Sequence, residues 1–150
     1  MADGGNPIRL PGHVYVPGQT PRHPEGWFDP IRRSARPGMS VAALGRSQAM
    51  QAGLVYLEAG YFWESHEVLE AVWLALPEDA PERQVVQALI QLANARLKLL
   101  MGRPKATLRL CGMVEAHLAG LEEANLPPNM SLAYVRAATQ RAREAANDAL

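Results

Sequence analysis

Proline and glycine are unevenly distributed along this chain, and their placement limits regular structure to the part after residue 38. Seven of the 12 prolines and six of the 12 glycines precede residue 39. Proline lacks a backbone N–H donor, and the residue before it avoids helical backbone angles. We therefore expect an irregular N-terminal arm over residues 1–38 and a helical bundle domain over residues 39–150. Three apolar side chains of the arm, Tyr15, Trp27 and Phe28, are expected to dock on this domain.

The remaining prolines and glycines, together with two serines, predict five helices. Ser40 is a suitable N-cap and Gly60 a suitable C-terminal residue for the first helix. Pro81 and Pro104 suit the first turns of later helices, and Ser131 is a suitable cap for the last one. The five expected helices span residues 41–59, 61–76, 81–101, 104–121 and 132–149. Short connections favour antiparallel neighbours, so we predict an all-α fold, a small antiparallel bundle of about five helices.

The apolar residues indicate how these helices pack. In the helix over residues 61–76, Phe62, Leu69 and Trp73 share one side, so Trp73 is expected in the core. The helix over residues 81–101 is apolar round most of its circumference. A helix with this pattern is surrounded by other elements, which predicts a central position for it.

Composition and charge exclude several classes of protein. Hydrophobic residues make up 48% of the chain and charged residues 20%, as in globular proteins. The 15 Lys and Arg residues balance the 15 Asp and Glu residues, so no net positive field attracts nucleic acid or an anionic membrane. The single cysteine, Cys111, fits a reducing compartment, and the first residues lack the basic and apolar parts of a secretory signal. We expect a cytoplasmic protein that binds neither nucleic acid nor membrane.

The helix over residues 61–76 carries polar side chains beside its apolar side. His66 and Glu70 lie one turn apart on a face that borders the core. Glu67 is a borderline position, and Glu64 lies further round and is expected to be solvated. A buried carboxylate is costly unless it is paired or hydrogen-bonded, so His66 and Glu70 need partners.

The next helix offers such partners. Polar residues form a stripe along it, at Gln84, Gln87, Gln91, Asn94 and Lys98. Because a short loop joins the two helices, we expect hydrogen bonds from His66 or Glu70 to Gln87, Gln91 or Asn94. The predicted polar network comprises Glu64, His66, Glu70, Trp73, Gln87, Gln91 and Asn94.

The chain resembles a known family. The run from Gly60 to Glu70, GYFWESHEVLE, is followed by Trp73 and by QALIQ at residues 87–91. This pattern is similar to the Gly-x-x-x-Glu-x-His-Glu-x-x-Glu-x-x-Trp core and the Leu-Ile-Gln helix of the domain of unknown function 309 family. The resemblance covers roughly residues 45 to 122, with Ser65 where alanine is usual, and residues 15–24 resemble an extension of some members. It implies an all-helical bundle and no activity.

Two hypotheses about function follow from the polar residues. The first is a non-catalytic binding or scaffolding module, in which the His/Glu/Gln centre fixes how two helices dock. The second is a metal-dependent or general-base hydrolase acting on a small molecule through His66, Glu67 and Glu70. In the metal version His66 and Glu70 are ligands and Glu67 is the base, by analogy with His-Glu-x-x-His proteases.

The metal hypothesis needs a third ligand, which His117, His13 or His23 would have to supply. In the metal-free version Glu67 or Glu70 is the general base. The sequence identifies no cofactor, and the partner is an unknown small molecule or protein, with homo-oligomerisation an open alternative. Arg32, Arg33 and Arg36 form a basic cluster that is small for a nucleic-acid site. We interpret Cys111 as a buried, inert thiol.

Overall fold

The computed structural model describes residues 8–128 and 130–150, and every regular element within these ranges is helical. Residues 1–7, which include the start of the predicted arm, and Asn129 lie outside the described ranges. In chain order the elements are α1 (Asp29–Arg32), α2 (Val41–Gly45), α3 (Gln48–Ala59), α4 (Phe62–Ala75), α5 (Pro81–Leu100), α6 (Pro104–Leu118), the 3₁₀ turn η1 (Glu123–Asn125) and α7 (Leu132–Asp148). The predicted all-α bundle is confirmed.

Most of the helix boundaries lie where the sequence predicts them. Gly60 ends α3 with a φ of 91°, a left-handed angle that costs glycine little. Pro81 and Pro104 begin α5 and α6, and the Ser131 hydroxyl accepts the Tyr134 N–H at the start of α7. The local chemistry of these caps and prolines therefore positions the long helices.

The prediction of a single helix over residues 41–59 was wrong, because these residues do not form one continuous helix. Two helices, α2 and α3, take its place, with a break at Arg46 and Ser47. The Ser47 hydroxyl accepts the Met50 N–H and donates to the Leu44 carbonyl. Ser47 thus serves as a second N-cap after Ser40, and a serine that binds the backbone in this way competes with helix continuation.

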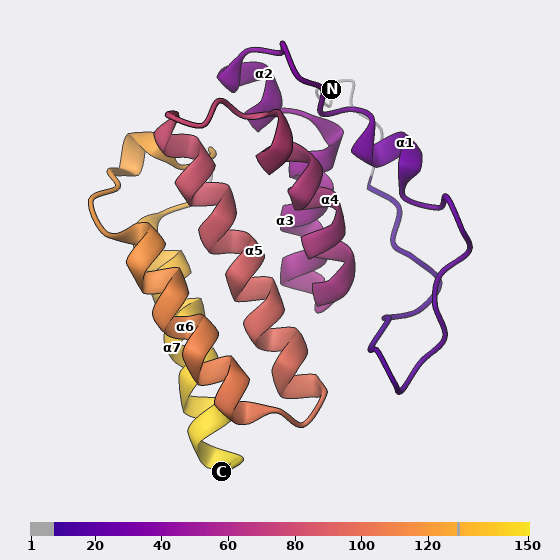
Figure 1. Cartoon of the computed structure of the whole chain (residues 1–150), viewed down its shortest axis with the longest axis vertical. Coiled ribbons are helices and arrows are strands. Elements are labelled where there is room, and N and C mark those ends of the chain that lie inside the picture. The colour runs from indigo at the N-terminus through magenta and orange to yellow at the C-terminus, as the bar shows by residue number, and fades with distance from the viewer. Residues whose placement is uncertain (1–7, 129) are drawn as a thin grey trace.

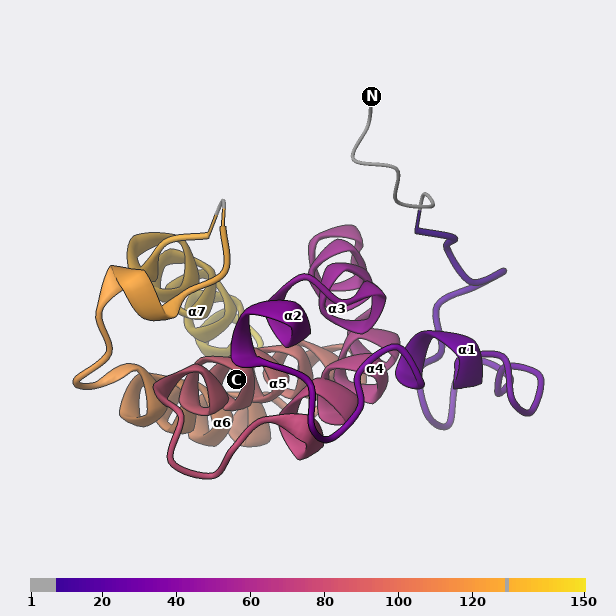
Figure 2. The same ribbon diagram turned by 90° about the horizontal axis from the view of Figure 1, so that it is seen from above.

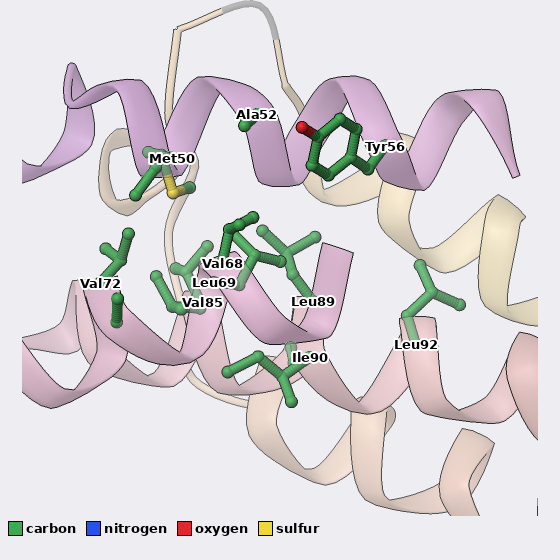
Figure 3. Packing of buried hydrophobic residues seen from close by; sticks show 14 of the residues in the cluster. Met50, Ala52, Tyr56, Val68, Leu69, Val72, Val85, Leu89, Ile90 and Leu92 are labelled. Carbon is green, nitrogen blue, oxygen red and sulfur yellow. The ribbon is translucent and has the colours of Figure 1, made fainter. Parts of the chain in front are cut away.

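Helix α5 occupies the centre of the bundle, as predicted. It packs against α4 on one side and against α6 and α7 on the other (Figure 1). The main core lies where α3, α4 and α5 meet, and Figure 3 shows Tyr56, Leu69 and Leu89 within it. A smaller cluster joins the second half of the bundle at Ala95, Leu110, Cys111 and Ala142. No helix of the described ranges is long and apolar enough to cross a membrane.

Helices α3 and α4 approach each other closely at Gly53. A Cβ atom added there would lie 2.3 Å from a methyl carbon of Leu69, whose side chain is fully buried. The Ser65 hydroxyl of α4 also donates to the Gly53 carbonyl at 2.7 Å. The two helices are therefore held in register by one hydrogen bond and one contact that only glycine permits.

The described part of the arm, residues 8–38, runs along the side of α4 that faces away from α5 (Figures 1 and 2). Tyr15 and Phe28 are buried, and Trp27 is half-buried against the core. The expected docking of these three aromatic side chains is confirmed. Helix α1 contributes Ile31 to the same core, so the arm completes a face of α4 that would otherwise be exposed.

Candidate functional site

The predicted site residues of α4 divide between two environments. His66, Glu67, Glu70 and Trp73 are half-buried, whereas Glu64 is completely buried with 0% of its surface exposed. The expectation that Glu64 is solvated was wrong. Glu64 lies one and two turns before Val68 and Val72, which are also buried, so it belongs to the inner face of the helix.

The expected hydrogen bonds between α4 and α5 are not formed. Within residues 8–128 and 130–150, none joins His66 or Glu70 to Gln87, Gln91 or Asn94. The His66 Nδ1 atom lies 3.2 Å from the Trp63 carbonyl oxygen of its own helix. From the glutamine stripe, Gln84 contacts His117 of α6, with 2.7 Å between Oε1 and Nδ1. The remaining four stripe residues, Gln87, Gln91, Asn94 and Lys98, are half-buried along α5.

The hydrogen bonds expected between α4 and α5 are absent from the described ranges because the Glu67 and Glu70 carboxylates of α4 pair with a positive charge in the arm. The guanidinium of Arg32 lies 3.6 Å from Glu67 Oε2 and 3.6 Å from Glu70 Oε1. It also donates a hydrogen bond to the Glu67 carbonyl oxygen. Arg32 therefore attaches α1 to the outer edge of α4, and neutral amides of α5 cannot match this charge pairing.

Glu64 is the centre of a second contact with the arm. Its Oε2 atom accepts the Tyr15 backbone N–H at 2.7 Å and lies 2.5 Å from the His23 Nε2 atom. The His23 side chain is itself only 4% exposed. The other oxygen, Oε1, is buried and has no hydrogen-bond partner among residues 8–128 and 130–150. A buried carboxylate with one free oxygen is uncommon in proteins.

Aromatic rings surround the His23 imidazole. Its ring centroid lies 5.2 Å from Phe28, 6.2 Å from Trp63 and 6.3 Å from both Tyr15 and Trp27. The Tyr15 and Trp63 rings meet edge to face at 5.0 Å. Three of these rings come from the arm and one from α4, so the arm and the helix build this enclosure together.

A cavity of about 430 Å³ opens beside this enclosure. We call it the arm cleft. Its walls include Tyr15, His23, Trp27, Phe28 and Trp63. Charged side chains lie at its edge, among them Arg22, Glu25, Asp29, Arg32 and Glu67. The predicted site residue Glu67 therefore lies at the arm cleft, and its neighbour Glu64 lies behind His23.

Glu64 also influences the core. Burial, and to a smaller extent the Glu64 carboxylate, raise the pKa of Tyr56 to about 12. The Tyr56 hydroxyl donates to the Arg9 carbonyl oxygen at 2.9 Å, which attaches a further part of the arm to α3. The phenol is thus kept neutral and is used as a hydrogen-bond donor.

The predicted metal ligands are not brought together. No group of three His, Cys, Asp or Glu side chains in the described ranges is arranged to hold a metal ion. Of the proposed third ligands, His117 contacts Gln84, His23 contacts Glu64, and His13 lies 2.6 Å from the Pro21 carbonyl oxygen. Each is placed in the arm or on α6, where it meets a partner other than His66 or Glu70.

Trp73 and Cys111 both contact the core of the bundle and lie outside the arm cleft. Trp73 is half-buried and packs against the core from its edge, so the expectation of a fully core tryptophan was wrong. The Arg83 guanidinium lies 3.9 Å from the centre of its ring, and Arg83 also donates to the Trp73 carbonyl.

Cys111 is buried, and burial raises the pKa of its thiol, which disfavours the reactive thiolate.

The comparison with protein families covers the helices that carry Glu64 and Glu67. Residues 50–110 match the family described as Domain of unknown function (DUF309). No curated protein and no solved structure matches the chain. The matched segment includes α4 and α5 and ends before α7, and it excludes every arm residue of the cleft. The match over residues 50–110 confirms the predicted resemblance to the domain of unknown function 309 family.

Proposed function

We propose that this protein is a small-molecule binding module whose binding site is the arm cleft. The observation that carries this proposal is the Glu64–His23 pair, which is buried directly behind an aromatic-walled cavity and has one carboxylate oxygen unpaired within the described ranges. A pair with a purely architectural role is expected to satisfy all of its polar atoms.

The shape and chemistry of the cleft support the proposal. Ligand pockets are concave and about 300–1,000 Å³ in volume, and a few polar groups in them orient the ligand. The arm cleft has a volume of about 430 Å³ and four aromatic walls. Of its charged groups, Arg32 is already oriented by Glu67 and Glu70, so it presents a fixed guanidinium edge.

Ligand-detected NMR with a library of small polar aromatic fragments tests this proposal. Trp27→Ala should abolish binding of the fragments found with the unchanged protein, because Trp27 lines the cleft. Trp73→Ala is the matched control, since Trp73 is also half-buried against the core but lies outside the cleft. Fragments that bind both variants equally, or that bind neither the unchanged protein nor its variants, would contradict the proposal.

A general-base hydrolase is the second candidate, and the Glu64–His23 contact favours it. A carboxylate bound to one nitrogen of a histidine orients the ring and leaves the other nitrogen, here Nδ1, to accept a proton. His23 and Glu67 both line the cleft, so a water molecule bound there could be activated by His23. Of the three residues expected for a hydrolase, only Glu67 lines this cleft; His66 and Glu70 do not.

Hydrolysis of p-nitrophenyl acetate separates the two candidates. A hydrolase should turn over this ester with rates that fall at least about tenfold in His23→Gln. His13→Gln is the control, because His13 stacks on His23 at 4.6 Å but does not contact Glu64. Equal rates for the two variants would rule out His23 as the base and leave the binding function.

We also propose a cytoplasmic location. The single cysteine cannot form a disulfide within the chain, and its buried thiol is suited to a reducing compartment. Fractionation of cells that express a tagged full chain would test the assignment, and recovery with the membrane or secreted fraction would contradict it.

A further inference from the structure

A second concavity lies beside the arm cleft, between the C-terminal half of α4 and the segment that follows α1. Its volume is about 510 Å³. We call it the arginine groove, and its principal lining residues are Arg33, Ala35, Arg36, Ala71, Leu74 and Ala75. Asp29 and Arg32 border both cavities.

The positive charge of this groove is not neutralised within the described ranges. Arg32 is engaged by Glu67 and Glu70, but no carboxylate lies within ion-pair distance of Arg33 or Arg36 there. Both side chains are exposed, and Asp29 is the only acidic residue that lines the groove. A chain with zero net charge therefore places two guanidinium groups side by side at one site, and among the described residues the Arg36 guanidinium donates only to the Arg33 carbonyl oxygen, at 3.3 Å.

The floor of the groove is apolar. Leu74 is 58% exposed although it lies within α4, and it is among the most exposed large hydrophobic side chains of the described ranges. Ala71 and Ala75 are one helical turn apart beside it, and Ala35 closes the floor from the arm. These small side chains leave room for another backbone to approach α4.

From this combination we infer that the arginine groove binds an acidic peptide segment that places an apolar side chain against Leu74. An amphipathic helix fits because it presents apolar and acidic residues together, and grooves bind such helices through apolar anchors spaced by one turn. The acidic residues pair with Arg33 and Arg36, which gives the interaction its charge preference. Nucleic acid offers no apolar anchor for the floor, and a flat membrane does not match a concave surface.

Fluorescence anisotropy with synthetic peptides tests the inference. Three labelled peptides of about 14 residues, roughly four helical turns, are compared. The first carries leucines at helical spacing with glutamates between them, the second replaces glutamate by lysine, and the third replaces leucine by serine. The first peptide should bind most tightly. In Arg33→Glu/Arg36→Glu its affinity should fall at least about tenfold, and that of the lysine peptide should rise.

A matched variant controls for overall charge. Arg109→Glu/Arg136→Glu changes the net charge by the same amount at two exposed positions on α6 and α7. It should leave binding of the first peptide within about twofold of the original. Leu74→Ser should weaken the first peptide at least about fivefold and leave the third unaffected. If Arg33→Glu/Arg36→Glu does not fold, Arg33→Gln/Arg36→Gln gives the same comparison.

Three results would overturn the inference. The first is that both double variants weaken binding of the first peptide equally, which would show that only the net charge of the protein matters. The second is equal affinity for the first and third peptides, which would show that no apolar side chain anchors the peptide against Leu74. The third is binding to vesicles of anionic lipid that depends on Arg33 and Arg36 without any binding of the peptides. Trp27→Ala, which should abolish binding at the arm cleft, should not change peptide binding, so failure here is distinct from failure of the proposed function.

Discussion

The Glu64 carboxylate and the His23 imidazole lie 2.5 Å apart and join α4 to a segment 41 residues earlier in the chain. Both side chains are almost entirely removed from solvent. The same carboxylate oxygen also accepts the Tyr15 N–H, so one buried acidic group fixes two points of the arm. Pairing of this kind makes the arm part of the folded domain, and loss of the arm should destabilise the part of the bundle that α3 and α4 build.

The first prediction concerns this pair. His23→Ala leaves the buried Glu64 carboxylate with the Tyr15 N–H as its remaining partner and should lower the free energy of unfolding by about 3–5 kcal/mol. Glu64→Gln keeps the shape and should cost less, about 1–3 kcal/mol. Urea denaturation of the single and double variants measures the coupling. The double variant should cost less than the sum, and strict additivity would show that the two groups do not interact.

The second prediction concerns Gly53. Replacing a helical glycine by alanine normally stabilises a helix by roughly 1 kcal/mol. Gly53→Ala should instead destabilise by about 1–3 kcal/mol, because its Cβ would overlap the fully buried Leu69 side chain. Gly112→Ala on α6 is the control, since nothing lies within 4 Å of its added Cβ. Stabilisation by both substitutions would show that α3 and α4 are not closely packed at this point.

The third prediction concerns Trp73. Its position at the edge of the core lowers the expected loss for Trp73→Ala to about 2 kcal/mol, roughly half of that for a fully buried tryptophan. The stacked Arg83 guanidinium should contribute about 0.5–1 kcal/mol of this through cation–π attraction. A double-mutant cycle of Trp73→Ala and Arg83→Ala measures that coupling. A loss of more than about 4 kcal/mol in the free energy of unfolding would show that Trp73 is fully buried in the core.

The fourth prediction concerns the docked arm. Phe28 is 6% exposed and meets Tyr56 and Trp63 edge to face, so Phe28→Ala should cost about 3–5 kcal/mol. Deletion of residues 1–38 should likewise lower the melting temperature. Leu74→Ala, at an exposed position, should change stability by less than about 0.5 kcal/mol. An unchanged melting temperature after the deletion would mean that the arm does not support the bundle.

The fifth prediction is a dependence of stability on alkaline pH. The pKa of Tyr56 is raised from 10.0 to about 12, so between these values the unfolded chain releases a proton that the folded chain retains. The contribution of Tyr56 to stability is therefore complete below pH 10 and is lost as the pH rises through 12. Denaturation of the unchanged protein and of Tyr56→Phe from pH 8 to about 12 measures the difference in slope. Parallel slopes would contradict the shifted pKa.

The sequence predicted the helices well because their boundaries depend on local chemistry. Pro81, Pro104 and Ser131 act on the first turn of their own helices, and periodicity over one helix was enough to place α5 at the centre. The break at Ser47 was missed because Ser40 offered an equally good cap a few residues earlier. Each of these helix boundaries depends on residues that are close together in the sequence, so it can be predicted without knowing the fold.

The partners of the site residues could not be predicted in the same way. Arg32 and His23 reach α4 through an arm without periodicity, so nothing in the spacing of residues assigned them to Glu67 or Glu64. One signal was available: Glu64, Val68 and Val72 recur at intervals of four, which marks Glu64 as an inner position. A buried glutamate requires a donor, and the two histidines of the arm were among the candidates.

The Glu64–His23 pair crosses the boundary of the matched segment, since Glu64 lies within residues 50–110 and His23 precedes them. The proposed binding site at the arm cleft is therefore built from two pieces of chain, of which only one lies in the matched segment. A different sequence in place of residues 8–38 would give new walls to the same carboxylate and leave the packing of α5 with α6 and α7 untouched. Changes within the arm are therefore expected to alter the proposed binding site while the packing of α5 with α6 and α7 stays the same.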